Sequence, residues 1–254
     1  MKALVLAAGY ATRLRPLTDT WAKELLPVGG TPIVDRILAS VEAVPEIDEI
    51  HLVTNARKAP AFDEWAAGRN VVVHDDGTTS NEDRLGAIGD MQFVVERAAL
   101  DDHLLVIAGD NLFSFALSDF VSFWHRKGVA SAIAIRDVGS LELAAQYGVV
   151  DVDDDGRIRS FVEKPAQPAS TLAATATYLY HREHVRLIGR YLAERNAPDQ
   201  PGRFAEWLQT REPVYGWVFD TPWYDIGNLE QLLEADNRLR ADAGLPERAA
   251  YAPE

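Results

Sequence analysis

The segment from residue 4 to residue 28 reads LVLAAGYATRLRPLTDTWAKELLPV, and it contains the strongest signals in the chain. Its apolar start predicts a buried strand that ends at Gly9. A glycine at this point lets the chain turn sharply and present backbone N–H groups to a phosphate. Arg13, Arg15 and Lys23 follow among small residues and prolines. The planar fork of an arginine and the point charge of a lysine suit phosphate oxygens, so the segment predicts an anion-binding loop.

Strand-like apolar runs alternate with helical patterns through the first half of the sequence. A helix is expected to begin near Pro32, and Asp83 and Ser118 are interpreted as the N-caps of two more. Strands that alternate with helices of this length imply right-handed crossovers and a mainly parallel, doubly wound α/β sheet. Ligands bind outside the carboxyl ends of such strands, where the opening loop lies. The expected strands cover residues 3–7, 50–54, 71–74, 104–108 and 132–135.

The second half of the sequence indicates a smaller, mixed sheet. Residues 149–165 read VVDVDDDGRIRSFVEKP, which predicts two strands joined by a tight turn at Asp155 and Gly156. The fold class is therefore α/β, Rossmann-like, with a mixed-sheet extension that closes over the parallel sheet. Further strands are expected at 175–180 and 214–219, with helices near 182–194 and 229–241.

Composition excludes several classes of protein. With 25 Lys and Arg against 39 Asp and Glu, the 254-residue chain has a net charge of −14, which repels nucleic-acid backbones. The sequence contains no cysteine, which excludes disulfides and thiolate metal sites. No apolar run is long enough for a signal peptide or a membrane span. We therefore expect a soluble, cytoplasmic protein that binds neither nucleic acid nor membrane.

The opening segment matches neither common nucleotide fingerprint. The pattern G-x-x-x-x-G-K-[ST] is absent, and Ala11 stands where G-x-G-x-x-G requires its second glycine. A surface loop with solvated cations is the alternative interpretation. The segments LAAGYATRLRPLT and AKELLPV nevertheless resemble the signature of sugar-1-phosphate nucleotidyltransferases, such as the glucose-1-phosphate thymidylyl- and uridylyltransferases. In this chain Ala11 replaces a commoner glycine of the signature, and Ala22 replaces a commoner proline.

The resemblance implies the nucleotide-diphospho-sugar transferase type of fold, in a single nucleotidyltransferase domain over residues 1–254. Residues 1–140 would form the nucleotide-binding half, and residues 141–254 the sugar-phosphate-binding half with a C-terminal helix. The hexapeptide repeats of the family's longer bifunctional members are missing, so no second acyltransferase domain is expected. The residues implied to bind the nucleotide are Ala8, Gly9, Thr12, Arg13, Asn81 and Gly86.

Two aspartates are candidates for a metal site. Asp110 follows the apolar run 104–108, and Asp225 lies in the segment WYDIG before a predicted helix. Either aspartate alone is typical of a cap or a turn. Mg²⁺ takes hard oxygen ligands, often one or two carboxylates plus phosphates. The resemblance implies that Asp110 and Asp225 share the Mg²⁺ that accompanies an NTP, and that Arg13, Lys23 and Asp110 are catalytic.

The acceptor side is indicated by the segment FVEKP at residues 161–165. Its proline ends a strand and leaves Glu163 and Lys164 at the strand terminus, where pockets lie. An exposed Glu–Lys pair is the ordinary interpretation. The resemblance implies that Glu163 binds sugar hydroxyls, that Lys164 binds the sugar phosphate and that the backbone of Gly148 approaches the sugar. Tyr178 is assigned to the same site.

The nucleobase cannot be assigned from the sequence. Family members often carry a glutamine after the third strand, but residues 74–90, HDDGTTSNEDRLGAIGD, contain none. Small and polar residues in this segment, among them Asn81 and Gly86, could line a base. Thymidine, uridine, cytidine and guanosine therefore all stay open.

The resemblance implies that an NTP and a sugar 1-phosphate react to give an NDP-sugar and pyrophosphate. The acceptor phosphate would attack the α-phosphorus in line, with Mg²⁺ as cofactor. The alternative is a cytidylyltransferase that acts on phosphocholine or another small phosphate monoester. A glycosyltransferase and a non-catalytic nucleotide-sugar-binding protein are two further hypotheses. Family members usually self-associate, which makes a homo-oligomer an expectation.

Overall fold

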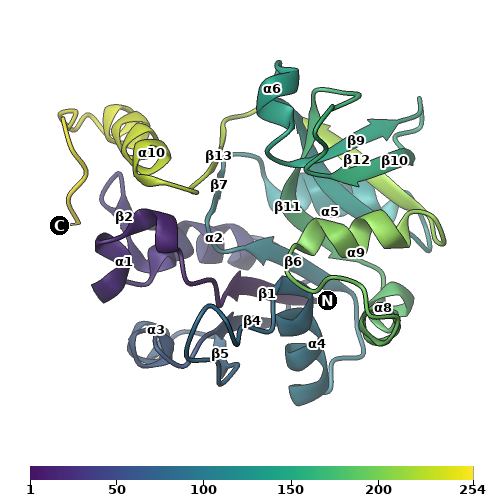
Figure 1. Cartoon of the computed structure of the whole chain (residues 1–254), viewed down its shortest axis with the longest axis horizontal. Helices are drawn as coiled ribbons and strands as arrows, with labels where there is room; N and C mark the ends of the chain where they lie inside the picture. The colour runs from purple at the N-terminus through teal and green to yellow at the C-terminus, as the bar shows by residue number, and fades with distance from the viewer. Residues whose placement is uncertain (254) are drawn as a thin grey trace.

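The parallel part of the sheet is built around β1 (Lys2–Ala7). This strand pairs in parallel with β4 (Glu49–Thr54) and with β6 (Leu104–Ala108), and β5 (Val72–Asp75) continues the sheet beyond β4. These four strands lie where the sequence predicts them, and the doubly wound α/β class is confirmed (Figure 1). The structure is a computed structural model, and it describes residues 1–253.

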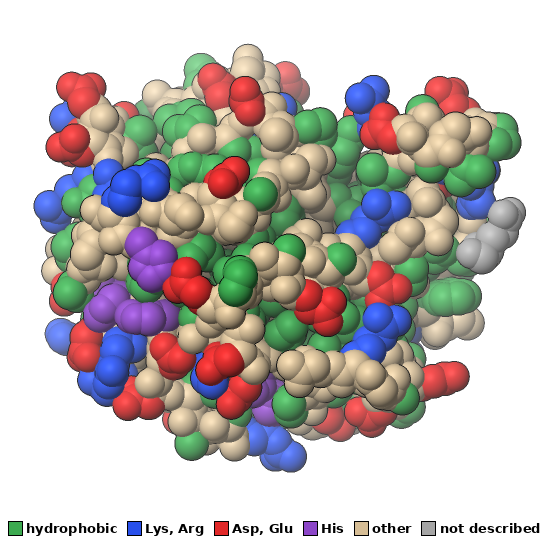
Figure 2. All heavy atoms as spheres, turned by 180° about the vertical axis from the view of Figure 1, so that it is seen from behind, with side chains coloured by type: hydrophobic (Ala, Val, Ile, Leu, Met, Phe, Trp, Pro, Cys, Tyr) green, Lys and Arg blue, Asp and Glu red, His purple; other side chains and the backbone are tan. Residues whose placement is uncertain are grey.

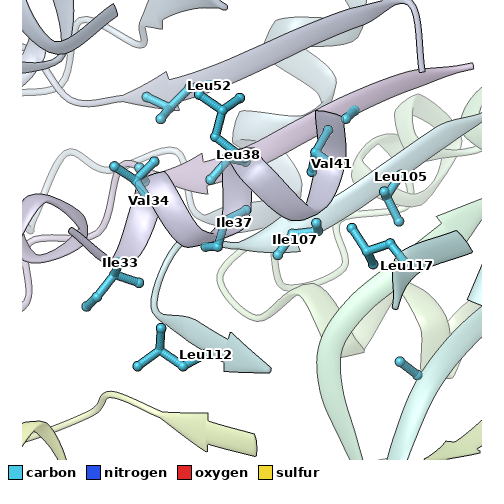
Figure 3. Close-up of a cluster of buried hydrophobic side chains, with 14 of the residues drawn as sticks. Ile33, Val34, Ile37, Leu38, Val41, Leu52, Leu105, Ile107, Leu112 and Leu117 are labelled. Atoms are coloured by element: carbon cyan, nitrogen blue, oxygen red, sulfur yellow. The ribbon is translucent and has the colours of Figure 1, made fainter. Parts of the chain in front are cut away.

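Helices cover both faces of this parallel sheet. Side chains alternate along β1, so that Val5 joins one hydrophobic cluster and Leu4 joins the other. On the first face lie α2 (Ile33–Glu42) and α5 (Leu117–His125), and on the second lies α4 (Ala87–Arg97). The apolar stripe of α2 packs against β-strand residues in Figure 3 and comprises Ile33, Val34, Ile37, Leu38 and Val41.

An antiparallel region continues the same sheet beyond β6. Strand β11 (Leu172–Tyr180) pairs with β6 in antiparallel orientation, and it also pairs with β8 (Ser131–Asp137). Strand β12 (Val214–Phe219) runs parallel to β8 at the edge. Strands β9 (Gly148–Val152) and β10 (Ile158–Glu163) form the predicted hairpin. The mixed extension is therefore confirmed, but it continues the parallel part as one nine-stranded sheet within residues 1–253, whereas the sequence analysis expected it to close over that part.

Two helix starts differ from the prediction. Helix α4 begins at Ala87 after Gly86 as N-cap, and Asp83 does not cap it. Helix α5 begins at Leu117 after Ala116, so Ser118 lies inside the helix and does not cap it. In each case an apolar face defines the helix more strongly than a nearby capping side chain, because burial stabilises a helix more than one cap does.

The remaining elements connect these layers or lie at their edges. The predicted helix near 182–194 is two short helices, α7 (Arg182–Val185) and α8 (Ile188–Ala193), and the predicted C-terminal helix is α10 (Leu229–Asp242). The elements not yet named are η1 (Thr12–Leu14), α1 (Leu17–Thr20), η2 (Lys23–Leu25), β2 (Pro27–Val28), β3 (Thr31–Pro32), α3 (Ala59–Ala66), β7 (Asn111–Phe113), α6 (Leu141–Ala144), α9 (Pro201–Leu208) and β13 (Trp223–Asp225).

Two further observations concern the surface charge and the helix lengths. Acidic and basic side chains alternate on the face that Figure 2 shows, and no continuous basic surface crosses that face. Across residues 1–253, every helix is too short or too polar to cross a bilayer.

A buried histidine pair links β4 and β5. The ring nitrogens His51 Nδ1 and His74 Nε2 are 3.0 Å apart, and both side chains are at most 4% exposed. Only one of the two nitrogens can donate in this contact, so a second proton would set two N–H groups against each other. Burial, with the nearby charges of His51 and Arg97, lowers the pKa of His74 to about 4.

We predict that this pair makes the protein acid-sensitive. The unfolded chain takes up a proton near the ordinary pKa of 6.5, whereas folded His74 resists it down to about 4, so stability falls as the pH drops through this window. The free energy of unfolding should fall by about 2 kcal/mol from pH 7 to pH 5 on account of this group. Urea unfolding at the two pH values measures it. His74→Gln should show a smaller fall, and the exposed control His125→Asn an unchanged one; equal falls in all three proteins would contradict the assignment.

Candidate active site

The β7–β13 ladder brings two predicted metal ligands together. Asp225 of β13 pairs with Asn111 of β7, and the backbone N–H of Ile226 donates to the carbonyl oxygen of Asp110 at 3.2 Å. Both strands lie beyond the carboxyl end of β6, where a doubly wound sheet binds its ligands (Figure 1). Residues 115 positions apart in the sequence thus become neighbours at one edge of the sheet.

Lys23 forms an ion pair with Asp110, one of these two carboxylates. Its ammonium group donates to Asp110 Oδ2 at 2.6 Å and to the carbonyl oxygen of Ile226 at 3.3 Å. Burial alone would lower the pKa of Lys23, but the charges of Asp110 and Glu24 outweigh it and raise the pKa. Burial, followed by the repulsion from Asp110, raises the pKa of Asp225 to about 6 although Lys23 opposes the shift. The pair thus lies in a buried site whose nearby cations are Lys23, Lys164 and Arg13.

Two cavities meet at Asp110. One, of about 310 Å³, lies on the side of the opening loop and is lined by Lys23, Asn81 and Gly86 among others. The other, of about 260 Å³, lies on the side of the β9–β10 hairpin and also includes Asp225. The residues that line both cavities are Ala108, Asp110, Asp199 and Pro201. Two separate ligands can therefore approach the same carboxylate from opposite sides.

The opening loop is held in a tight turn. Ala11 has a left-handed φ of 44°, and its carbonyl oxygen accepts hydrogen bonds from the Thr18 hydroxyl at 2.9 Å and from the backbone N–H of Leu14 at 3.0 Å. The Asn55 side chain donates to the carbonyl oxygen of Ala8 at 3.0 Å. Ala8 and Gly9 line the first cavity. The loop therefore presents its small residues to that cavity.

Two predicted residues of this loop lie elsewhere. Thr12 is exposed, and it lines neither of the two cavities. Arg13 lines the second cavity, near Gly227, where a Cβ in place of a glycine hydrogen would lie 3.5 Å from the Arg13 Nη2 atom. The structure thus places Arg13 at the junction with the acceptor side and not in the first cavity.

The left-handed backbone of Ala11 predicts a stabilising substitution. A residue with a Cβ is strained in this conformation, and glycine is not. Ala11→Gly should therefore raise the free energy of unfolding by about 0.5–1 kcal/mol, measured by denaturant titration. Ala8→Gly is the matched control, because Ala8 has no positive φ, and it should destabilise. A destabilised Ala11→Gly protein would contradict the strain.

The second cavity is built around the carboxylate of Glu163. This side chain is 8% exposed, and burial raises its pKa although Lys164 and Arg203 oppose the shift. Two glycines make room for it: a Cβ on Gly148 would lie 3.0 Å from Glu163 Oε2, and a Cβ on Gly202 would lie 1.9 Å from the same oxygen. The carboxylate therefore lies between two strictly glycine-sized positions at the wall of the cavity.

Other predicted acceptor residues line the same cavity. Lys164 has a left-handed φ of 50°, and its N–H donates to the carbonyl oxygen of Tyr147 at 3.0 Å. Tyr178 lies on β11 after a register shift between Ala174 and Tyr178, a bulge of the kind found beside active sites. The structure thus brings Gly148, Glu163, Lys164 and Tyr178 together, as the sequence analysis expected of one binding site.

The loop at the far side of the first cavity is shaped by Asp83 and Arg84. The Asp83 carboxylate accepts backbone N–H bonds from Thr79 at 3.1 Å and from Ser80 at 2.8 Å, so it stabilises the loop and not the helix. Arg84 donates to Asp199 at 2.7 Å and ties the loop to the second half of the chain. Gly86 has a φ of 79°, and a Cβ there would lie 2.7 Å from the carbonyl oxygen of Pro198.

Several cavity-lining residues were not predicted from the sequence. Glu24 follows Lys23 directly, and its pKa is raised to about 7 by burial, with Lys23 opposing. Asp90 is buried on α4, while Asp199 and Gly202 come from the segment before and within α9. The position of Glu24 directly after Lys23, in the segment AKELLPV, could have indicated that it lies in the cavity. No local signal exists for the others, because only the tertiary structure brings them to the cavities.

The donor set fits a hard cation. Residues 1–253 contain no group of three or more His, Asp or Glu side chains arranged to hold a metal. Asp110 lines both cavities, and Asp225 lines the second cavity with it. Mg²⁺ is typically held by one or two carboxylates together with substrate phosphates and water, so a full protein cage is not required.

These features define a class of protein: an α/β fold that places a cation-bearing loop and a carboxylate pair between two ligand cavities. The family model for nucleotidyl transferase matches residues 2–242, and the chain belongs to this family. The resemblance seen in the opening motifs is thereby confirmed.

Individual relatives agree with this assignment. The chain is 27% identical over 94% of its length to the bifunctional protein GlmU of Methanocaldococcus jannaschii, of which it covers 54%. It is 30% identical over 92% of its length to the UTP–glucose-1-phosphate uridylyltransferase of a Synechocystis species, of which it covers 62%. The chain thus spans between half and two thirds of these relatives. A solved UDP-glucose pyrophosphorylase in complex with UDP-glucose has the same fold, with a TM-score of 0.80, 22% identity and coverage of 95% and 98% of the two chains.

Proposed function

We propose that this protein joins an NTP to a sugar 1-phosphate and releases pyrophosphate, so that an NDP-sugar is formed. The observation that supports this most directly is the meeting of two cavities at Asp110, with Lys23 on one side and Lys164 on the other. A transfer between two phosphate-bearing ligands needs such an arrangement, because both anions must approach one point in an acidic protein.

The proposed reaction is a transfer of the nucleotidyl group to the acceptor phosphate, and the cations of the two cavities take part in it. An oxygen of the acceptor phosphate attacks the α-phosphorus, and the bond between the α-phosphorus and the bridging oxygen breaks, so that pyrophosphate leaves with that oxygen. A phosphate monoester is largely ionised at neutral pH, and no strong general base is required. Lys23 neutralises charge at the α-phosphate, and Lys164 positions the acceptor phosphate. The N–H groups of the loop after β1 hold the remaining phosphate oxygens of the NTP, and the Arg13 guanidinium, which lines the second cavity, adds positive charge at the junction with the acceptor.

Asp110 and Asp225 would hold the metal ion. When bound, Mg²⁺ would supply positive charge to the phosphate oxygens around the reacting phosphorus. The pairing of β7 with β13, which brings the two carboxylates to one edge of the sheet, supports this assignment. We also propose that Glu163 binds sugar hydroxyls, and we keep the single-domain organisation, the cytoplasmic location and self-association as predictions.

The test is a matrix of NTPs against phosphate monoesters, read by pyrophosphate release. Release should require an NTP, Mg²⁺ and a sugar 1-phosphate together, and omission of any one should abolish it. Turnover with phosphocholine but with no sugar 1-phosphate would favour the cytidylyltransferase alternative. Transfer of a sugar from an NDP-sugar to an acceptor, without pyrophosphate chemistry, would overturn the proposal in favour of a glycosyltransferase.

A further inference from the structure

Asp90 is a buried acid beside the first cavity, and the proposed reaction does not use it. It lies in the first turn of α4, is 5% exposed and lines the cavity together with Asn81 and Gly86. Within residues 1–253, its Oδ1 atom has no hydrogen-bond partner. A buried acceptor without a partner destabilises the fold, because it has lost its hydration and gained no hydrogen bond. Such an atom beside a ligand cavity is satisfied when the ligand brings a donor.

Asp90 lines the cavity at the start of α4, together with the loop residue Asn81. The phosphate-binding groups proposed above, Gly9 and Lys23, line the same cavity near Asp110. A nucleotide with its α-phosphate at Asp110 and its base against the loop that carries Asn81 and the start of α4 would place that base beside Asp90.

The surroundings of Asp90 present acceptors to the cavity. The carboxyl group of Asp76 lies within hydrogen-bonding reach of Asp90, and burial together with Asp76 and Asp199 raises the pKa of Asp90 to about 8. One oxygen of Asp76 is already engaged, because it accepts from the N–H and the hydroxyl of Thr78 at 2.7 and 2.8 Å. The unpartnered Oδ1 of Asp90 is therefore the acceptor that a ligand can engage when the side chain turns toward the cavity.

Arg84, which lines the same cavity, does not reverse this polarity. Arg84 forms a two-pronged contact with Asp199, with N–O distances of 2.7 and 3.2 Å, and also donates to the carbonyl oxygen of Asn81. Its donors are thus directed at those oxygens. The terminal torsion of an aspartate is broad, so either oxygen of Asp90 can turn to the cavity.

We propose, resting on the proposed function, that Asp90 selects the nucleobase by accepting a hydrogen bond from an exocyclic amino group. The preferred NTP then carries guanine, cytosine or adenine and not uracil or thymine. The amino bases present N–H₂ donors on the edges that distinguish them. Uracil and thymine have one ring N–H between two carbonyl oxygens, and those oxygens would face the acceptors of Asp90 and Asp76. Buried polar groups left unpaired in this way discriminate strongly between ligands.

The test is equilibrium binding of GTP, CTP, ATP, UTP and dTTP to the full chain, measured by titration calorimetry without an acceptor. The wild-type protein should bind at least one amino-base triphosphate about tenfold or more tightly than UTP and dTTP. Asp90→Asn offers a donor as well as an acceptor and should reduce this ratio by about tenfold or reverse it, and Asp90→Ala should abolish it. Asp236→Asn is the matched control: it removes a buried acid on α10, outside the nucleotide cavity, and should leave the ratio unchanged.

Two results would overturn the assignment of Asp90: tighter binding of UTP or dTTP by the wild-type protein, or an unchanged ratio in Asp90→Asn. The near-isosteric Asp90→Asn variant decides the question even if Asp90→Ala fails to fold, and thermal unfolding checks both. Binding does not require turnover, so the two proposals fail separately. Base discrimination that depends on Asp90, without pyrophosphate release in the NTP matrix, refutes only the proposed reaction. Turnover that is fastest with UTP or dTTP refutes only the role of Asp90.

Discussion

Replacing Asp110 by asparagine is expected to lower kcat/KM for pyrophosphate release by about a thousandfold, with little effect on the fold. Asparagine keeps the shape of the side chain but removes the charge that pairs with Lys23 at 2.6 Å and that would hold the metal ion with Asp225. Asp110 is also the side chain at which the two cavities meet, so its loss affects both ligands. Steady-state kinetics with saturating Mg²⁺ measures the effect.

The control for this substitution is Asp101→Asn. Asp101 is exposed and forms ion pairs with Arg182 and Arg186, outside both cavities. Exposed ion pairs contribute little to stability, and activity should stay at the wild-type level. Circular dichroism should show the same fold in both variants. An Asp110→Asn enzyme with wild-type activity would exclude Asp110 from the chemistry.

The second large effect is expected from Gly202→Ala. The new Cβ would lie 1.9 Å from Glu163 Oε2, so the carboxylate must move from its position at the wall of the acceptor cavity. Hydrogen bonds to a charged group contribute about 1.5–3 kcal/mol, which corresponds to a rise of about tenfold to a hundredfold in KM for the sugar phosphate. KM for the NTP should stay unchanged, because Glu163 and Gly202 line only the second cavity.

Gly189→Ala is the matched control for a glycine in a helix. Its Cβ would meet only the side chain of Gln92, at 3.4–3.6 Å, which is an ordinary contact. Alanine has the higher helix propensity at both positions, so neither variant should lose stability through the helix itself. If KM for the acceptor is the same in Gly202→Ala and Gly189→Ala, Glu163 does not bind the acceptor.

Features that depend on a short stretch of sequence were predictable. The apolar run of β1 followed by Gly9, and the run of β6 followed by Asp110, show a buried strand and its polar end within a few residues. The Asp155–Gly156 turn likewise encodes its hairpin locally. The meeting of Asp110 with Asp225 was inferred from the family resemblance, and the β7–β13 ladder supplies its structural basis.

Features that depend on tertiary packing were not predictable. Strand 132–135 was found, but its apolar pattern cannot show that β8 runs antiparallel to β11. Asp83 has the chemistry of a cap, yet the loop N–H groups of Thr79 and Ser80 compete for it successfully. Gly202 has no local signature at all, since its need for glycine comes from Glu163, 39 positions away.

The most direct test of the account is a crystal structure with NTP and Mn²⁺ in place of Mg²⁺, in which anomalous scattering locates the ion. We predict a single site within about 2.1–2.3 Å of oxygens from both Asp110 and Asp225, with the α-phosphate as a further ligand. An ion bound by phosphates alone, or a site that includes neither or only one of these carboxylates, would contradict the central claim that the two acids together hold the metal between the two cavities.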